Sequence, residues 1–223
     1  MKPLDIGDKP LISIILPTFN RAAHLQPCIE SVVNQTFPSW ELLVIDDGST
    51  DHTFQVVDAF LQADRRIRYC KHQNRKQMLS RNVGIQLSLG EYLTFLDSDD
   101  AYAPNHLETC LHFMQTHPKI DLMHCGIKLE EDVWFADYYQ SGQLIHLKDC
   151  VITPGFFGKR EVFFALEGFQ NLSYGEDTDL WERAGKRFNV QKIASPETYI
   201  YTRASESFSK KAADALATQP KQH

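Results

Sequence analysis

Residues 92–100 read Y-L-T-F-L-D-S-D-D, a largely apolar run followed at once by three carboxylates within four positions. The run Tyr92–Leu96 has the length and composition of a buried strand. Asp97, Asp99 and Asp100 repel one another unless a cation neutralises them. Hard divalent cations such as Mg²⁺ and Mn²⁺ prefer one or two carboxylates together with substrate phosphates. The stretch therefore predicts a strand that ends at a turn suited to hold a metal ion against a diphosphate.

The residues around this stretch alternate between short apolar runs and apolar residues at helical spacing. Strands are predicted at 11–16, 42–45, 67–70, 92–96 and 120–125, and helices at about 22–35, 53–63, 77–88 and 104–116. Such alternation implies an α/β fold, with a mostly parallel central sheet and crossover helices on both of its faces. Ligands of these sheets lie beyond the carboxyl ends of the strands. The segments that follow the strands are therefore the places to look for a site.

After residue 125 the alternation weakens. Residues 126–158 are rich in Gly, Tyr and Phe and indicate short strands and loops. Helices are predicted at 160–166 and 177–187, and a last strand pair at 190–202. No internal repeat or linker is visible, so we expect one domain over residues 1–208. The Lys-, Ala- and Gln-rich residues 209–223 are expected to form a disordered tail.

The composition excludes several classes of protein. Acidic residues outnumber basic ones by 29 to 23 in 223 residues, which argues against a nucleic-acid partner. The five cysteines form no C-x-x-C pair, which argues against a disulfide framework or a zinc ribbon. No run of 18 apolar residues predicts a transmembrane segment, and the N-terminus lacks the apolar stretch of a signal peptide. We expect a cytoplasmic protein, and contact with the inner face of the membrane and a homodimer stay open.

Motifs of three rival enzyme classes are missing. No two of the 11 glycines are two positions apart, so the G-x-G-x-x-G of dinucleotide-dependent oxidoreductases is absent. Gly158-Lys159 lacks the glycine that a P-loop needs five residues earlier, where Thr153 stands. A nuclease that used the acidic cluster would need a basic groove, which this composition does not promise.

Two further acidic clusters accompany the one at residues 97–100. Asp46-Asp47 follows the strand at 42–45, where a solvated turn before a helix is the ordinary explanation. Residues 176–179 read E-D-T-D, and a helix start accounts comfortably for one acid there but less well for three. A carboxylate at that position also suits a general base that removes a proton from a hydroxyl group.

Several motifs, taken in order, resemble one known family. They are S-I-I-L-P-T-F-N-R at 13–21, S-x-x-x-Q-T at 31–36, W-E-L-x-V-I-D-D-G-S-T-D at 40–51, S-R-N-x-G at 80–84, G-E-Y-L-x-F-L-D-S-D-D at 90–100, G-F at 168–169 and E-D-x-D-L-W-x-R at 176–183. Each motif alone is weak, but the series runs from about Leu11 to about Arg203. The sequence therefore resembles the family-2 glycosyltransferases.

The resemblance implies a GT-A fold and an inverting transfer of a sugar from a nucleotide-diphosphate donor, most commonly a UDP-sugar, by a metal-dependent hexosyltransferase. The residues that would bind the nucleotide sugar are Pro17, Thr18, Asn20, Arg21, Asp46, Asp47, Arg81, Asp97 and Ser98. In that family Asp46 would accept a hydrogen bond from the base, and Asp47 and Arg81 would lie near the sugar or the phosphates.

The remaining roles fall on the two later acidic clusters. Asp97 and Asp99 would form the D-x-D motif that holds Mn²⁺ or Mg²⁺, with Asp99 as the more direct ligand. Asp177 would be the general base of the E-D motif. Glu176 and Trp181 would lie on the acceptor side, although the helical apolar spacing around Trp181 also suits a core residue. The implied acceptor is a saccharide or a lipid-linked saccharide in the synthesis of a cell-surface polysaccharide or glycoconjugate.

Two departures from the family pattern stand out. Lys76 occupies the position of a usual glycine, and no histidine follows Tyr201-Thr202-Arg203, where many members carry one. A catalytically silent sugar-nucleotide binder of the same fold is the alternative function. The presence of Asp46, Asp97, Asp99 and Asp177 argues for the enzyme.

Overall fold

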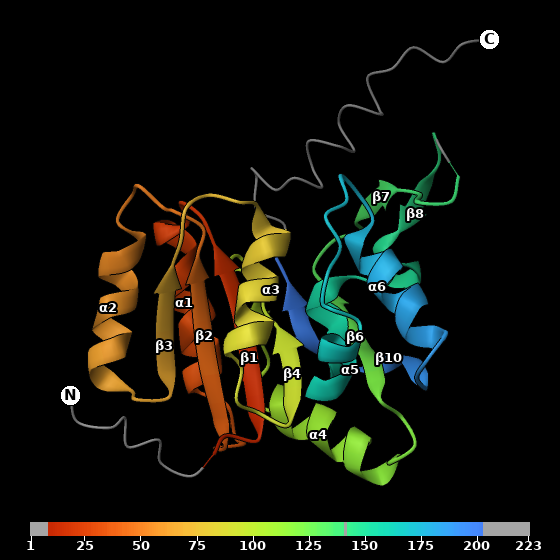
Figure 1. Cartoon of the computed structure of the whole chain (residues 1–223), viewed down its shortest axis with the longest axis horizontal. Helices are drawn as coiled ribbons and strands as arrows, with labels where there is room; N and C mark the ends of the chain where they lie inside the picture. Colours follow the sequence, from red (N-terminus) through yellow and green to blue (C-terminus); the bar gives the residue numbers. More distant parts are fainter. Residues whose placement is uncertain (1–8, 141, 203–223) are drawn as a thin grey trace.

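The apolar segment that starts at Ile12 lies in the middle of an eight-stranded sheet in the computed structural model, which describes residues 9–140 and 142–202 (Figure 1). The strand order is β3-β2-β1-β4-β9-β6-β10-β5. These strands are β1 (Ile12–Thr18), β2 (Trp40–Asp46), β3 (Ile67–Lys71), β4 (Tyr92–Phe95), β5 (Ala101–Tyr102), β6 (Leu122–Leu129), β9 (Phe156–Lys159) and β10 (Val190–Tyr201). All of them run in one direction except β9 and β5, so the predicted mostly parallel sheet is confirmed.

Helices cover both faces of this sheet, as predicted (Figure 1). They are α1 (Ala22–Val33), α2 (Thr53–Ala63), α3 (Gln77–Leu87), α4 (His106–Thr116), α5 (Arg160–Ala165) and α6 (Glu176–Gly185), with short 3-10 turns η1 (Leu147–Asp149) and η2 (Thr153–Gly155). A separate hairpin, β7 (Trp134–Ala136) and β8 (Leu144–His146), stands beside the start of α6 (Figure 1).

The alternation of side chains along the strands divides the core in two. In β1, Ile14 and Leu16 face α1, α2 and α4, whereas Ile15 faces α3, α5 and α6. All three are fully buried, and burying each one contributes roughly 1.5–3 kcal/mol. Because both faces are covered in this way, β1 reads as a continuous apolar run, and the chain reaches the surface only after the strand, at residues 19–21.

The second half of the sheet differs from the prediction. Residues 190–201 form one long strand instead of a strand pair, and β10 runs parallel to β6 with register shifts after Lys192. Gly126 of β6 allows this irregular stretch to approach, because a Cβ there would lie 2.5 Å from the carbonyl oxygen of Ala194. The strand β5 was not predicted, and β9 was covered only by the expectation of short strands and loops over residues 126–158. They are short, and β9 lies within a Gly- and Phe-rich piece.

Within the described ranges, every helix is too short or too polar to cross a lipid bilayer. The predicted domain boundary at residue 208 and the predicted tail at 209–223 lie outside the described residues.

Candidate functional site

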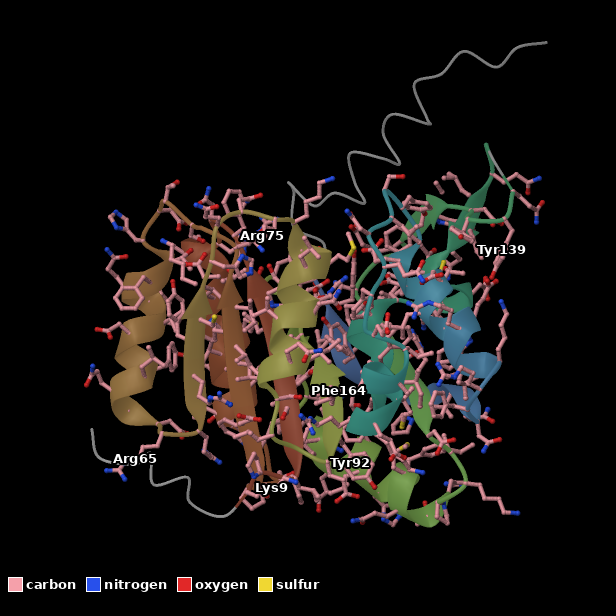
Figure 2. The ribbon with its side chains drawn as sticks, in the orientation of Figure 1. Lys9, Arg65, Arg75, Tyr92, Tyr139 and Phe164 are labelled. Atoms are coloured by element: carbon pink, nitrogen blue, oxygen red, sulfur yellow. The ribbon has the colours of Figure 1, made fainter. Side chains whose placement is uncertain are left out.

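A cavity of about 950 Å³ opens at the carboxyl ends of β1 and β4 and extends across to α6 and the β7–β8 hairpin. Its volume is in the range of small-molecule sites. Figure 2 shows Arg75, just before α3, and Tyr139, between β7 and β8, at the same end of the molecule, whereas Lys9 and Tyr92 lie at the opposite end. The predicted site residues that line the cavity are Pro17, Thr18, Arg21, Asp47, Arg81, Asp97, Ser98, Asp99, Glu176, Asp177 and Trp181.

Arg81, on α3, joins the two acidic clusters on either side of the cavity. Its Nη2 donates to Asp97 Oδ1 at 3.0 Å, and its Nη1 lies 3.5 Å from Glu176 Oε1 and 3.8 Å from Asp177 Oδ1. Burial alone would lower the pKa of Arg81, but the charges of these carboxylates outweigh it and raise that pKa above its ordinary value. The guanidinium is therefore a permanent cation that holds residues 97 and 177 together. Its buried Nε has no hydrogen-bond partner among the described residues.

Asp177 lies in the first turn of α6, with its carboxylate turned toward the cavity. Burial raises its pKa to about 6, since the nearby Arg81 guanidinium and a hydrogen bond from Thr153 offset only part of that effect and the Glu176 charge adds to it. Thr153, in η2, donates its hydroxyl proton to Asp177 Oδ1 in a short hydrogen bond. A fixed carboxylate that titrates near neutral pH has the properties of a general base.

The acidic turn after β4 is held from behind by the last strand. Tyr199 donates its hydroxyl to Asp100 Oδ2 at 2.6 Å and accepts the amide of Asp97 at 3.3 Å. The amide of Thr202 donates to Asp100 Oδ1 at 2.6 Å. Asp100 is thus committed to the scaffold, which leaves the side chains of Asp97 and Asp99 for the cavity.

The donor set of this turn fits a hard divalent cation. Burial and then the Asp97 charge raise the pKa of Asp99, and among the described residues Asp99 forms no salt bridge. Burial and the Asp97 charge also raise the pKa of Asp100, well above its ordinary value. A cation would relieve this repulsion, and carboxylate oxygens are the ligands that Mg²⁺ and Mn²⁺ prefer. Asp97 and Asp99 are the residues that would hold it.

Two of the residues predicted to bind the nucleotide sugar lie outside the cavity lining. Asp46 is fully buried and accepts the Ser49 amide at 2.7 Å and, in a short hydrogen bond, the Tyr69 hydroxyl. Asn20 Oδ1 accepts the amide of Thr50 at 2.8 Å, so its side chain joins the loops after β1 and β2. Asp47, next in the chain, does line the cavity. The base contact predicted for Asp46 therefore stays a prediction, and Asp47 is the acid of this pair that a ligand meets first.

Lys76, just before α3, places a positive charge in the cavity wall, and its backbone conformation is unfavourable for a residue other than glycine. Lys76 lines the cavity with φ 77° and ψ 154°, a conformation that glycine adopts freely and other residues rarely adopt. The neighbouring Gln77 donates its side-chain amide to Asp97 Oδ1 at 2.9 Å. Lys76 replaces the glycine that is usual in the family, but its backbone keeps a conformation typical of glycine.

The far side of the cavity is aromatic. Trp181 stacks on Phe156 with ring centroids 5.8 Å apart, so it is both a packed residue and part of the lining. Tyr138 and Tyr174 are exposed and also line the cavity. Gly175 has φ 79°, and a Cβ there would lie 2.2 Å from the ring of Tyr138, so only glycine permits this contact at the start of α6.

Sequence reasoning missed three residues that support the site. Thr153 holds Asp177, Gln77 holds Asp97 and Tyr199 holds Asp100. Each is a common residue type without a motif, and Thr153 and Tyr199 lie 24 and 99 positions from the acids that they bind. Only Gln77 had a sequence signal, because it stands at the start of a predicted helix beside the predicted site.

Comparison with known proteins gives a consistent result. A family model described as "Glycosyl transferase family 2" matches residues 13–167. An uncharacterized glycosyltransferase of Rickettsia bellii is 33% identical over 177 residues, which is 76% of this chain and 26% of that protein. The GalNAc(5)-diNAcBac-PP-undecaprenol beta-1,3-glucosyltransferase of Campylobacter jejuni is 41% identical over 104 residues, 46% of this chain and 34% of that protein. The chain spans about a quarter to somewhat under half of the length of the first curated relatives that it matches.

Solved structures share the fold. Residues 1–349 of S. aureus TarS in complex with UDP-GlcNAc align with a TM-score of 0.74 at 21% identity, over 90% of this chain and 61% of that one. The mannosyltransferase PcManGT from Pyrobaculum calidifontis, in complex with GDP-Man and Mn²⁺, aligns with a TM-score of 0.72 at 16% identity, over 95% of this chain and 66% of that one. At these identities the likeness concerns the fold, and together with the family match it confirms the predicted GT-A fold.

Proposed function

This chain belongs to glycosyl transferase family 2, and on that premise we propose that it transfers a sugar from a nucleotide-diphosphate donor to an acceptor hydroxyl with inversion at the anomeric carbon. The observation that carries the proposal is the Arg81 guanidinium, which lies 3.0 Å from Asp97 Oδ1 and 3.8 Å from Asp177 Oδ1. It brings the predicted metal ligand and the predicted base, 80 residues apart in the chain, into one cavity.

We assign the two sides of the cavity to the two substrates. The donor lies along Pro17, Thr18 and Asp47, where the buried hydroxyl of Thr18 has no partner among the described residues. The diphosphate lies between Lys76, Arg81 and the acidic turn. A divalent cation held by Asp97 and Asp99 would neutralise the leaving diphosphate as a Lewis acid.

The acceptor lies on the side of α6. Its hydroxyl oxygen attacks the anomeric carbon while the bond to the phosphate oxygen breaks, and the hydroxyl proton passes to Asp177. One displacement inverts the anomeric centre, so one base on the face opposite the leaving group is sufficient. Thr153 and Arg81 orient that base, and the pKa of about 6 keeps Asp177 ionised at neutral pH.

The proposed classes of donor and acceptor rest on what the related proteins bind or act on. The TarS complex contains UDP-GlcNAc and the Campylobacter relative is a glucosyltransferase that acts on an undecaprenol-linked saccharide. We therefore propose a UDP-hexose as donor and a saccharide or lipid-linked saccharide of a surface polysaccharide as acceptor. The sequence-based expectation of a cytoplasmic protein that contacts the inner face of the membrane is kept within this proposal.

A binding screen followed by turnover separates the enzyme from a silent binder. Thermal shifts with UDP-, GDP- and dTDP-sugars, each with and without Mn²⁺, identify the donor, because a ligand that binds the native state raises the midpoint. Release of the nucleoside diphosphate from that donor, with water or a saccharide as acceptor, then measures turnover. Absence of any shift in Mn²⁺ would contradict the whole proposal, whereas a shift without turnover would favour the silent binder.

Asp177→Asn tests the base. The variant should bind the donor with unchanged affinity and lose about 10²–10⁴-fold in kcat, because the amide cannot accept the hydroxyl proton. Asp179→Asn is the matched control: Asp179 belongs to the same cluster but pairs with Arg183 at 2.7 Å and does not line the cavity. Its kcat should stay close to that of the wild type. Full activity of Asp177→Asn would remove Asp177 from the mechanism.

A further inference from the structure

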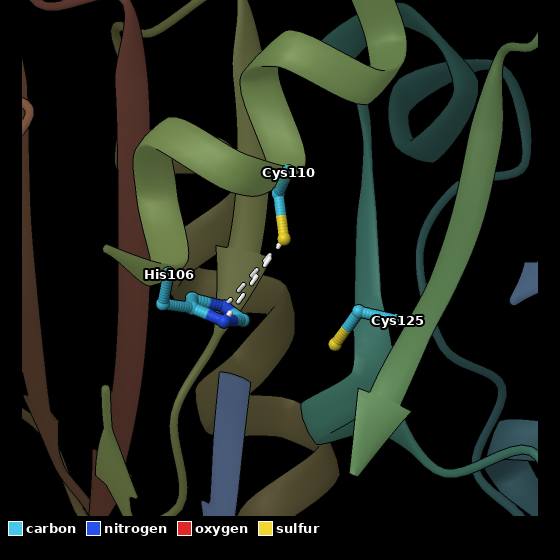
Figure 3. Close-up of side chains that lie close together, drawn as sticks. All are labelled: His106, Cys110 and Cys125. Carbon is cyan, nitrogen blue, oxygen red and sulfur yellow. Dashed lines mark hydrogen bonds between the residues drawn. The ribbon is translucent and has the colours of Figure 1, made fainter. Parts of the chain in front are cut away.

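Behind the acidic turn, on the face of the sheet that α4 covers, three metal-ligating side chains point toward one another. His106 and Cys110 lie one turn apart on α4, and Cys125 faces them from β6 (Figure 3). One ligand atom of each lies within 4.8 Å of the other two, and all three residues are buried. The proposed glycosyl transfer uses none of them.

The distances are close to those of a bound zinc ion. Zn–S bonds of about 2.3 Å and Zn–N bonds of about 2.0–2.1 Å place sulfur and nitrogen ligands about 3.6 Å apart in a tetrahedron and about 3.8 Å apart in a trigonal plane. Cys110 Sγ lies 3.9 Å from His106 Nε2. Since all three ligand atoms lie within 4.8 Å of one another, the widest pair would have to close by at most about 1 Å, which side-chain rotation can supply.

The imidazole is oriented as a metal-binding histidine usually is. His106 Nδ1 lies 2.8 Å from the hydroxyl oxygen of Thr198, on β10. When Nδ1 donates its proton to that oxygen, Nε2 keeps its lone pair for a metal, and such outer partners fix the tautomer and the ring orientation. Burial lowers the pKa of His106 to about 3, so the ring is neutral at physiological pH. Tyr102 stacks on the ring with centroids 4.0 Å apart and restricts its rotation.

Charge decides which ion fits. We propose that His106, Cys110 and Cys125 supply three ligands of a zinc site that joins α4 to β6. Zn²⁺ with two thiolates and a neutral imidazole carries no net charge, so the complex can lie in an apolar core, whereas Cu⁺ would leave one buried negative charge. Hard ions such as Mg²⁺ and Mn²⁺ disfavour thiolates, which separates this site from the carboxylates of the cavity.

Binding also has a definite proton balance. The hydrogen bond with Cys125 and then burial raise the pKa of the Cys110 thiol well above its ordinary value. A Zn–S bond to a protonated thiol forms as its S–H bond breaks, and that proton leaves to the solvent. Zinc uptake should therefore become tighter as the pH rises from 6 to 8.

Metal content tests the site directly. The chain without a histidine tag, purified without chelators, should contain about one zinc per molecule by mass spectrometry of the elements. X-ray absorption at the zinc edge should give two sulfur neighbours at about 2.3 Å and one nitrogen at about 2.0–2.1 Å. Zinc below about a tenth per chain after dialysis against zinc, or a shell of oxygen and nitrogen only, would overturn the proposal.

Variants separate this site from other buried thiols. Cys125→Ala should lose at least nine-tenths of the zinc, whereas Cys28→Ala should keep it. Cys28, on α1, is equally buried, but its thiol points to the backbone carbonyl of Asp97 and not to the other two ligands. Retention of zinc by Cys125→Ala would refute the assignment. If that variant fails to fold, Co²⁺ bound by the wild-type chain should show a thiolate charge-transfer band. Absence of that band, or a Cys110–Cys125 disulfide in the purified protein, would count against the site.

Discussion

The Asp177 carboxyl has a pKa of about 6 because burial raises it more than the Arg81 guanidinium lowers it. Its raised pKa means that the native state binds this proton more tightly than the unfolded chain does. The contribution of this group to stability is therefore present below about pH 4 and is lost as the pH rises toward 6. Activity should follow the opposite course, with kcat rising tenfold per pH unit below about 6 and constant above. A kcat that is independent of pH between 5 and 7 would contradict this assignment.

Arg81 is the cation on which this balance depends. Arg81→Met keeps the length of the side chain but leaves three carboxylates without their guanidinium, so the free energy of unfolding should fall by about 3–5 kcal/mol at pH 7.5 and by less at pH 5.5. The acidic limb of the kcat profile should also move to higher pH, because Arg81 lowers the pKa of Asp177. Denaturant unfolding and the pH profile measure the two effects. Arg81→Lys, which keeps the charge, should shift the limb less, and an unmoved limb in Arg81→Met would refute the coupling.

At the residue scale, the sequence predicted acids that line the cavity but not the residues that hydrogen-bond them. Asp97, Asp99 and Asp177 could be predicted because carboxylates at strand and helix ends need a reason to gather there. Thr153 and Tyr199 could not, because their importance comes from contacts made only in the folded chain. Asp46 shows the converse case: its motif is local, but the Tyr69 hydroxyl that binds it comes from another strand.

Among the elements, α3 starts at an unusual residue. Lys76 holds a backbone conformation that costs a non-glycine residue about 1–3 kcal/mol. Lys76→Gly should therefore raise the free energy of unfolding by about 1 kcal/mol, after the greater freedom of glycine in the unfolded chain is taken into account, and raise Tm by about 2–4 °C. The same variant should bind nucleoside diphosphate more weakly, since it loses a cation of the cavity.

Arg75→Gly is the matched control for this prediction. Arg75 also precedes α3, but its backbone is outside the positive-φ region. The substitution should lower the free energy of unfolding by about 0.5–1 kcal/mol, because only the freedom of the unfolded chain changes. Equal effects of the two variants would show that Lys76 is not strained.

The predicted elements of the first 125 residues are confirmed within a few positions, and α2 matches residue for residue. Their apolar pattern is strong because β1, β2 and β4 are buried throughout and the helices present apolar faces to the sheet. The second half was harder to predict. β9 is only four residues long and pairs antiparallel with both β4 and β6, a topology set by the whole sheet rather than by its own sequence. The predicted strand pair at 190–202 is one strand, β10, whose pairing with β6 shifts register between Lys192 and Glu197.

Over the whole molecule, the cavity gathers more negative charge than Arg81 and Lys76 balance. Burial raises the pKa values of Asp99, Asp100 and Asp177, so ionising these groups costs the native state stability. For Asp177, whose pKa is about 6, that cost grows as the pH rises from 5 to 7. Mg²⁺ bound to the carboxylates should reduce this cost. The rise in Tm that Mg²⁺ produces should therefore increase between pH 5 and pH 7 at constant ionic strength. Calorimetry with K⁺ as the control cation measures it. A shift that is equal at both pH values, or that persists in Asp99→Asn, would contradict the predicted role of this carboxylate.

The backbone of Thr202 binds Asp100, and the residue lies in the cavity wall, whereas Lys9 is exposed at the opposite end of the sheet (Figure 2). Because the two residues lie at opposite ends of the molecule, one can carry a dye while the other is attached to a surface. A dye coupled to a cysteine introduced by Thr202→Cys would report on the mouth of the cavity, and the backbone amide that holds Asp100 would be kept. Attachment to a sensor surface through Lys9 would leave that mouth facing the solution, so arrival and departure of a substrate could be followed on single molecules.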